Sequence, residues 1–123
     1  MTARTQALGR YGEDAAARHL AAAGLTVLER NWRCRAGELD IVALDGDTLA
    51  VCEVKTRTEH GFQSPTEAVD ADKAARLARL AEQWLAERWS GAPPPGGVRI
   101  DLLCVIHGRR GAAQVSHLPG AVG

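Results

Sequence analysis

The sequence predicts an α/β domain in which helices flank a mixed central sheet. Residues 5–23 and residues 70–89 have the apolar spacing of amphipathic helices, whereas apolar runs of strand length fill much of the remaining chain. The elements follow in the order α-β-β-β-α-β-β. The second helix lies between two strands and can serve as the crossover that joins parallel neighbours, while a tight turn joins two earlier strands as antiparallel neighbours.

Length and charge limit the kinds of protein that this chain can be. The chain has 123 residues, with 15 basic and 15 acidic residues apart from histidine, and its formal net charge is zero. This length predicts one domain, residues 1–123. We expect a cytoplasmic protein with no membrane partner, because no apolar run is long enough to cross a bilayer and the N-terminal residues lack the apolar core of a signal peptide. With zero net charge, nucleic-acid binding would depend on a local basic patch.

The first helix carries one stripe of apolar and aromatic side chains: Leu8, Tyr11, Ala15, His19 and Ala23. We expect the helix to end at Gly24. Glu13 lies at the border of this stripe, in line with residues that face the sheet. It can reach inward over the sheet, or it can pack its aliphatic stem and leave its carboxylate in water.

A first strand is expected over residues 25–29, followed by the segment Arg30-Asn31-Trp32-Arg33-Cys34-Arg35. This segment has two interpretations. The three arginines around Trp32 can contact phosphates while the indole stacks on a base or sugar. Alternatively, the segment is a solvated loop with a half-buried tryptophan.

Residues 37–55, GELDIVALDGDTLAVCEVK, have the pattern of a β-hairpin. Apolar runs at residues 39–44 and 48–54 flank Asp45-Gly46-Asp47, which is a strong turn signal. Charged side chains interrupt both runs, at Asp40 in the first and at Glu53 and Lys55 in the second. Because side chains alternate along a strand, Glu53 and Lys55 are expected to point to the same face.

The turn decides where Asp40 lies relative to Glu53. If Asp45-Gly46 is a two-residue turn, the two acids are diagonal neighbours, and if Gly46-Asp47 is the turn, they lie directly opposite. Both registers place the carboxylates on one face, about 5 to 8 Å apart, whereas a three-residue loop would send them to opposite faces. Glu38 shares a face with Asp40 and either joins the same acidic cluster or lies at its rim.

Two carboxylates at such a separation need a compensating charge. They repel by roughly 3 kcal/mol at about 5 Å and an effective dielectric constant of about 20. A divalent cation would offset this repulsion, and carboxylate oxygens suit Mg²⁺ or Mn²⁺ better than Zn²⁺. The alternative is an ordinary edge hairpin in which Glu53 pairs with Lys55 and the acids are solvated.

The second half of the chain completes the sheet. Residues 56–68 lack periodicity and are expected to form a loop, after which Asp70 has the position of a helix N-cap. Lys73 lies one turn before the apolar stripe of the second helix, and its amine either points at the edge of the sheet or reaches into solvent. Residues 98–106 have the pattern of a buried strand, and residues 112–118 that of a last, peripheral strand.

Taken together, these residues resemble a known pattern. Asp40, followed after twelve residues by Glu53-Val54-Lys55, resembles the Asp…(Asp/Glu)-x-Lys signature of restriction-endonuclease-like nucleases, whose core is also α-β-β-β-α-β. Further motifs resemble, in order, those of the YraN-like family of small bacterial proteins: Gly9-x-x-Gly12-Glu13, Arg30-Asn31-x-Arg33, Gly37-Glu38-Leu39-Asp40, Glu53-Val54-Lys55-x-Arg57, Val69-Asp70-x-x-Lys73 and Arg99-Ile100-Asp101. The resemblance covers most of the chain and implies a single restriction-endonuclease-like domain related to Holliday-junction resolvases.

The resemblance also implies roles for individual residues. Asp40 and Glu53 match the metal-binding acids, and Lys55 matches the catalytic lysine. Glu13 matches the helix acid of archaeal Holliday-junction resolvases and would be both catalytic and metal-binding. Leu39 stands where the full signature has a proline. The implied cofactor is Mg²⁺ or Mn²⁺.

Three basic residues are candidates for contacts with nucleic-acid phosphates: Arg33, Arg57 and Lys73. The strand alternation places Arg57 on the same face as Glu53 and Lys55. The resemblance implies that the partner is DNA. It also implies a homodimer, because resolvases act as dimers on two-fold symmetric junctions.

The implied function is metal-dependent hydrolysis of phosphodiester bonds in DNA, including branched DNA. Two other hypotheses come from different functional classes. One is a non-catalytic nucleic-acid-binding protein of the same fold that keeps the acids as a metal-dependent clamp, and the other is an interaction protein whose acidic cluster is structural. The presence of Lys55 beside the acids favours the enzyme, because a binding protein has little need of this lysine.

Overall fold

The chain folds into one five-stranded mixed sheet with a helix on each face. A computed structural model describes residues 3–58, 70–108 and 111–121. The elements are α1 (Ala3–Ala22), β1 (Thr26–Cys34), β2 (Gly37–Asp45), β3 (Thr48–Thr58), α2 (Ala71–Arg88), β4 (Val98–His107) and β5 (Gln114–Leu118). The strand order in the sheet is β1-β2-β3-β4-β5. This architecture confirms the predicted fold class and the predicted order of elements.

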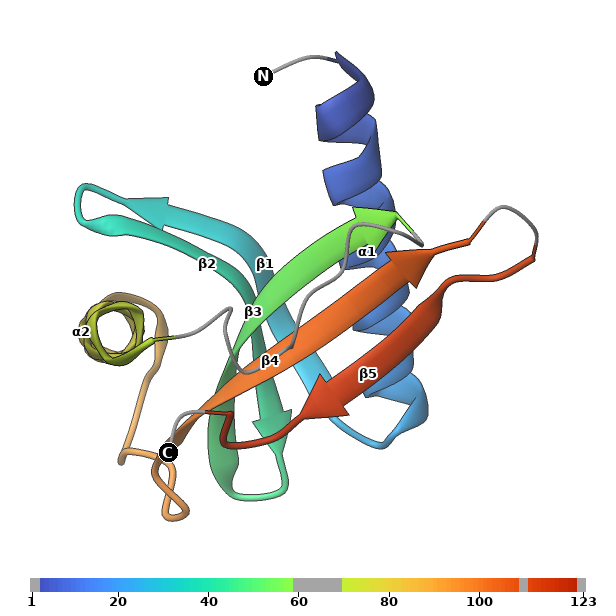
Figure 1. The fold of residues 1–123 in the computed structure, drawn as a ribbon. Helices are drawn as coiled ribbons and strands as arrows, with labels where there is room; N and C mark the ends of the chain where they lie inside the picture. The colour runs from blue at the N-terminus through green and yellow to red at the C-terminus, as the bar shows by residue number, and fades with distance from the viewer. Residues whose placement is uncertain (1–2, 59–69, 109–110, 122–123) are drawn as a thin grey trace.

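The direction of each strand follows from its connection. A short turn joins β2 to β3, and the two strands are antiparallel. The helix α2 separates β3 from β4, and these two strands are parallel neighbours, as expected of a crossover (Figure 1). Among the described residues, neither helix combines the length and the apolar composition that crossing a membrane requires.

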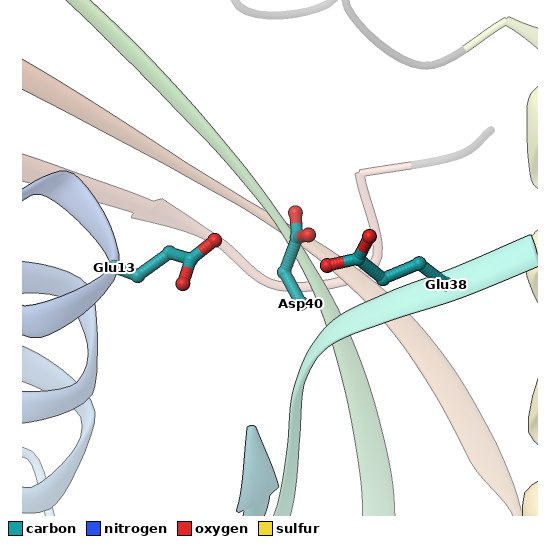
Figure 2. Close-up of side chains that lie close together, drawn as sticks. All are labelled: Glu13, Glu38 and Asp40. Atoms are coloured by element: carbon teal, nitrogen blue, oxygen red, sulfur yellow. The ribbon is translucent and has the colours of Figure 1, made fainter. Parts of the chain in front are cut away.

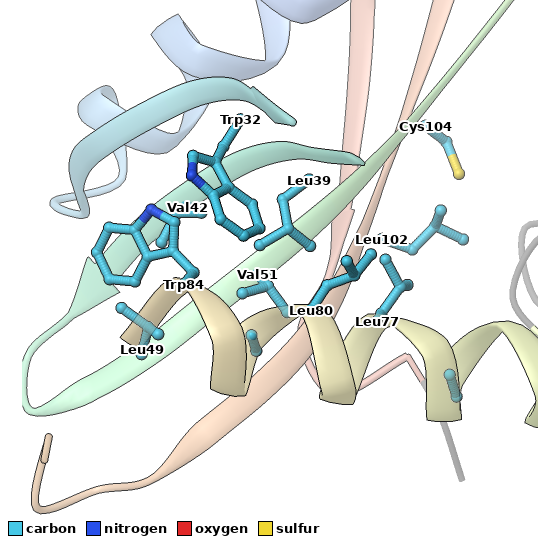
Figure 3. Close-up of a cluster of buried hydrophobic side chains, with 12 residues drawn as sticks. Trp32, Leu39, Val42, Leu49, Val51, Leu77, Leu80, Trp84, Leu102 and Cys104 are labelled. Carbon is cyan, nitrogen blue, oxygen red and sulfur yellow. The ribbon is translucent and has the colours of Figure 1, made fainter. Parts of the chain in front are cut away.

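Two buried clusters hold the helices against opposite faces of the sheet. The α2 cluster packs Leu80 and Trp84 against Val51 of β3, as Figure 3 shows. The α1 cluster packs Leu20 against Cys52, the next residue of β3. Because consecutive strand residues point to opposite faces, α1 and α2 cover different sides of the sheet.

The hairpin adopts one of the two registers that the sequence allows. Asp45 pairs with Thr48, so Gly46-Asp47 is the turn. Gly46 has φ of +61°, which suits the first central position of the tight turns that join antiparallel strands. The pairing of β2 with β3 then continues to Ile41 opposite Cys52 and ends there.

The first strand is longer than the sequence predicts, and the alternative of a solvated loop after residue 29 is wrong. Arg30, Trp32 and Arg33 all belong to β1 and pair with β2. The side chain of Trp32 is 7% exposed and packs in the α2 cluster, so its indole is not free to stack on a base. The apolar partner that buries Trp32 is α2, a helix about fifty residues further along the chain, which explains why local periodicity did not reveal the strand.

Three boundaries were predicted from local signals. Leu25 N–H bonds to Leu20 O after Gly24 at φ +96°, which ends α1 as expected. The Asp70 carboxylate accepts a hydrogen bond from the Lys73 N–H and caps α2. The predicted loop over residues 56–68 begins later than expected, since β3 continues through Thr58, and its remainder falls in residues 59–69, outside the described residues.

The first helix approaches β3 closely at Gly12. A β-carbon built on Gly12 would lie 1.7 Å from Thr56 Oγ1, so only glycine fits at this contact. Gly9, one turn earlier, has no neighbouring atom within 4 Å of the corresponding position. The absence of a side chain at residue 12 therefore sets the distance between α1 and β3, and with it the height of Glu13 above the sheet.

Gly12→Ala should destabilise the protein by about 1–3 kcal/mol, because the new methyl group overlaps Thr56 and must push α1 away from β3. Gly9→Ala is the matched control and should stabilise the protein by up to about 1 kcal/mol through its higher helix propensity. Urea unfolding of the two variants measures both effects. Equal changes at the two glycines would show that α1 does not depend on this contact.

Candidate metal and catalytic site

Three carboxylates converge between α1 and β2. Glu13 reaches from α1, and Glu38 and Asp40 come from β2, as Figure 2 shows. One carboxylate oxygen from each lies within 4.8 Å of the others, and all three side chains are half-buried. Such a set of hard oxygen donors can hold a divalent cation. Glu38 thus belongs to the cluster and does not lie at its rim.

The carboxylate of Asp40 is held in place by the backbone of β3. The paired residues of β2 and β3 end at Ile41 and Cys52, and beyond them Asp40 Oδ2 accepts a hydrogen bond of 2.9 Å from the Val54 N–H. The side chain therefore takes the place of a backbone acceptor where the two strands separate. This bond ties the acid of β2 to the strand that carries Glu53 and Lys55.

Excess negative charge surrounds Asp40. Burial raises its pKa to about 7, and the carboxylate of Glu53 adds to the rise, followed by those of Glu13 and Glu38. The hydrogen bond from Val54 opposes these effects without cancelling them. Within the described part of the chain, no ion pair involves Glu13 or Asp40. A cation bound here would supply the charge that the protein does not.

Glu53 lies close enough to raise the pKa of Asp40, but its own partners are lysines. Its Oε1 is 3.1 Å from the Lys73 Nζ of α2 and 3.8 Å from the Lys55 Nζ of its own strand. The described three-acid cluster does not include it. Of the two directions that the sequence leaves open for the Lys73 amine, this contact shows the one toward the sheet. The prediction that Glu53 binds the metal remains a prediction.

Lys55 lies in an environment that disfavours its charged form. Burial lowers the pKa of its ammonium group, and the neighbouring ammonium of Lys73 lowers it further, whereas Glu53 acts in the opposite direction. A lysine whose pKa is lowered gives up its proton more readily than an exposed lysine does. Such a group is suited to exchange a proton with water or with an oxygen of a substrate.

The predicted phosphate-binding residues differ in their accessibility. The side chain of Arg33 is 77% exposed, with its Nε 3.3 Å from Glu38 Oε2. Arg57 is also exposed and donates a hydrogen bond to its neighbour's backbone, the carbonyl of Thr56. Both guanidinium groups are open to a ligand, whereas Lys73 is 19% exposed and faces Glu53.

A completely buried acid, Asp101, provides a contrast with the half-buried Asp40. Asp101 of β4 is completely buried and accepts hydrogen bonds from two nitrogens of Arg99 and from the Gly120 N–H. His117 Nε2 lies 2.8 Å from its second oxygen. Although burial acts to raise the pKa of Asp101, these partners hold it below its usual value. This satisfied acid joins β4 to the C-terminal segment and has no unmet charge for a metal.

The sequence predicts two acids of the cluster, Glu13 and Asp40, as metal ligands, and it leaves two features open. The alternation of β2 predicted that Glu38 and Asp40 share a face, but it left the place of Glu38 in the cluster undecided. The role of the Val54 N–H had no signal in the sequence, because a backbone donor is the same in every residue. Only the separation of two strands made this donor available to a side chain.

Comparisons with known proteins give one consistent result. The family described as "Uncharacterised protein family UPF0102" matches residues 12–105. A protein of Streptomyces griseus named "UPF0102 protein" is 64% identical over 114 residues, which are 93% of this chain and 94% of the relative. A UPF0102 protein of Streptomyces coelicolor is 61% identical over 115 residues, which are 93% of this chain and 87% of the relative. A UPF0102 protein of Parafrankia is 54% identical over 117 residues, which are 95% of this chain and 97% of the relative.

The pKa of Asp40 predicts how stability depends on pH. Its folded-state pKa of about 7 lies above the value of about 4 expected in the unfolded chain, so its contribution to stability is complete below pH 4 and is lost as the pH rises through 7. Asp40→Asn cannot ionise and keeps an oxygen for the Val54 N–H. In EDTA, the free energy of unfolding of the variant relative to wild type should therefore increase by about 2 kcal/mol between pH 5 and pH 8. A difference that is constant with pH would show that Asp40 ionises like an exposed acid.

Proposed function

Since the chain belongs to the uncharacterised protein family UPF0102 (the YraN-like family), we propose its function from the geometry of the site: a metal-dependent nuclease that hydrolyses phosphodiester bonds of DNA. One observation carries the proposal. Three carboxylates converge, two of which, Glu13 and Asp40, have no ion-pair partner among the described residues. Asp40 lies close to Glu53, which is two residues from the partly buried Lys55. Acids alone would suit a simple metal clamp, and the lysine adds a group that can take part in hydrolysis.

The donor set fits a hard divalent cation. Glu13, Glu38 and Asp40 offer carboxylate oxygens in a half-buried position, and Asp40 retains a proton to about pH 7 in the absence of a counter-charge. Oxygen donors of this kind select Mg²⁺ or Mn²⁺, and none of the three residues supplies the thiolate or imidazole typical of zinc. When bound, such a cation neutralises charge on the phosphate and makes a coordinated water more acidic.

Residues of the protein would position the cation, exchange a proton with water and contact the phosphates. Asp40 is held rigidly by the Val54 amide, so the position of its carboxylate does not depend on the substrate. Lys55 would orient the attacking water and exchange a proton at its Nζ, a role that its lowered pKa favours. Arg33 and Arg57, whose side chains are exposed, would contact phosphates and fix the position of the DNA backbone.

Branched DNA is the substrate class that the resemblance to Holliday-junction resolvases favours. A junction is two-fold symmetric, and two copies of this chain would present two sites to it. Because the chain has zero net charge, it has no broad basic field, and its binding to DNA would depend on local contacts such as those of Arg33 and Arg57.

Cleavage of a panel of linear, single-stranded, flapped and four-way-junction DNA in Mg²⁺, Mn²⁺ or EDTA tests the proposal. Wild-type protein should cut at least one substrate with either metal and none in EDTA. Asp40→Ala and Lys55→Ala should each lower the rate by at least roughly 100-fold while circular dichroism shows a folded protein. Arg76→Ala, which removes an exposed charge from α2, is the control and should cut at the wild-type rate.

Two outcomes would contradict the nuclease. Equal rates in wild type, Asp40→Ala and Lys55→Ala would show that the cluster does not perform the chemistry. Metal-dependent binding without cleavage, weakened at high salt, would instead identify a non-catalytic nucleic-acid-binding protein that uses the same acids as a clamp.

A further inference from the structure

The side chains of β2 change face partway along the strand. Leu39 and Ile41 are two residues apart, and regular alternation would place both on the same side of the sheet. Leu39 nevertheless packs in the α2 cluster (Figure 3), whereas Ile41 packs in the α1 cluster together with Ala43. Val42, which follows Ile41, lies in the α2 cluster as alternation requires. The alternation is therefore broken at Asp40.

The neighbouring strand β1 changes face at the same level. The side chain of Arg30 lies on the α1 side, because it pairs with Asp14 of α1 at 2.6 Å. Trp32, two residues later, packs in the α2 cluster. The register of β1 with β2 leaves the intervening residue, Asn31, opposite Asp40. Both strands thus change face at one cross-strand pair.

The backbone of Asn31 accounts for this change of face. Its φ is +53°, and it is the one residue other than glycine with a positive φ in the part of the chain that the structure describes. Extended residues turn successive side chains to opposite faces, and a left-handed residue interrupts this alternation. Asparagine adopts the left-handed conformation more readily than most residues that carry a β-carbon. Because the side chain of Asn31 is exposed, core packing does not explain the asparagine, whereas the left-handed backbone does.

The change of face determines which acids meet Glu13. If the alternation continued unbroken from Ile41, Glu38 and Asp40 would lie on the side of α2, away from Glu13. Leu39 would then leave the α2 cluster. In the structure, Glu38 and Asp40 instead converge with Glu13 of α1, as Figure 2 shows. The assembly of the acidic cluster therefore depends on the break in β2.

We propose that Asn31 is a positioning residue of the candidate site, because its left-handed backbone bends β1 and β2 together at Asp40. The bend aims the Asp40 carboxylate at the Val54 N–H. It also brings Glu38 beside Glu13. The inference rests on the proposed function, in which these acids hold a cation. Only the backbone of Asn31 is needed, so glycine, which adopts positive φ at little cost, should replace it.

Hydrogen exchange of the Val54 amide tests the bend without metal or cleavage. Asn31→Val introduces a β-branched residue that disfavours positive φ, whereas Asn31→Gly permits it. In EDTA, the Val54 amide should exchange at least roughly tenfold faster in Asn31→Val than in wild type, and at about the wild-type rate in Asn31→Gly. The Leu49 N–H, which bonds to Gly97 O on the same strand, is the internal reference. A general loss of stability would accelerate both amides, whereas loss of the bend accelerates Val54 relative to Leu49.

Calorimetry with Mn²⁺ tests the consequence for the cluster. Affinity falls with the fraction of molecules in which the site is assembled, so Asn31→Val should bind Mn²⁺ at least roughly tenfold more weakly than wild type. Asn31→Gly should stay within about threefold of wild type. Gln114→Val, which places valine at an exposed position of β5, is the matched control and should bind as wild type does. If Asn31→Val does not fold, Asn31→Ala, which also disfavours positive φ, replaces it.

Two results would overturn the inference. Wild-type exchange at Val54 and wild-type Mn²⁺ affinity in Asn31→Val would show that packing of Trp32 and Leu39 alone sets the bend. Equal losses in Asn31→Val and Asn31→Gly would show that the carboxamide acts directly.

The same variants separate the inference from the proposed function. A wild-type protein that cuts no DNA, together with the expected exchange at Val54 in both variants, would refute the nuclease and support the positioning role. Cleavage at the wild-type rate by Asn31→Val, with unchanged exchange at Val54, would refute only the positioning role.

Discussion

The hydrogen bond from the Val54 amide to Asp40 stands where β2 separates from β3, and the geometry of the site depends on it. Beyond Ile41 and Cys52 the two strands no longer pair, and β1 and β2 run together toward α2 (Figure 1). The separation would leave a backbone donor of β3 without a partner, and a carboxylate supplies one at 2.9 Å. The same bond fixes an acid of β2 beside the acid and the lysine of β3. The Val54 N–H, which needs a hydrogen-bond acceptor, thus receives one from Asp40, a carboxylate that can also bind a cation.

Asp101, which is completely buried, and Asp40, which is half-buried, have opposite surroundings. Asp101 receives a guanidinium, an imidazole and a backbone amide, and these partners lower its pKa despite complete burial. Asp40 receives one amide and faces other acids, and its pKa rises to about 7. The first arrangement stabilises the junction of β4 with the C-terminal segment. The second costs stability at neutral pH, because Asp40 ionises less readily in the folded protein than in the unfolded chain.

Both helices contribute to the site through features that their own stability does not require. Gly12 lowers helix propensity, yet its missing side chain lets α1 approach Thr56 and brings Glu13 over the sheet. Lys73 opposes the dipole of α2, yet it reaches Glu53 of β3. In each case a locally unfavourable residue is compensated by a contact with the same strand. A residue that destabilises its own helix and contacts the sheet is best explained by that contact, because helix stability alone would favour another residue there.

The sequence by itself determined the order of elements, the hairpin, the caps at Gly24 and Asp70, and the acids on β2, because caps, turns and alternation act over a few residues. Tertiary structure decided which of the two turns forms, that Trp32 lies in the core, and that Glu38 completes the acidic cluster. It also decided that Glu53 faces lysines. Each of these outcomes depends on a neighbour from a distant part of the chain. A local pattern predicts the face of the strand on which a side chain lies. The residues that contact this side chain are determined only when the helices pack on the sheet.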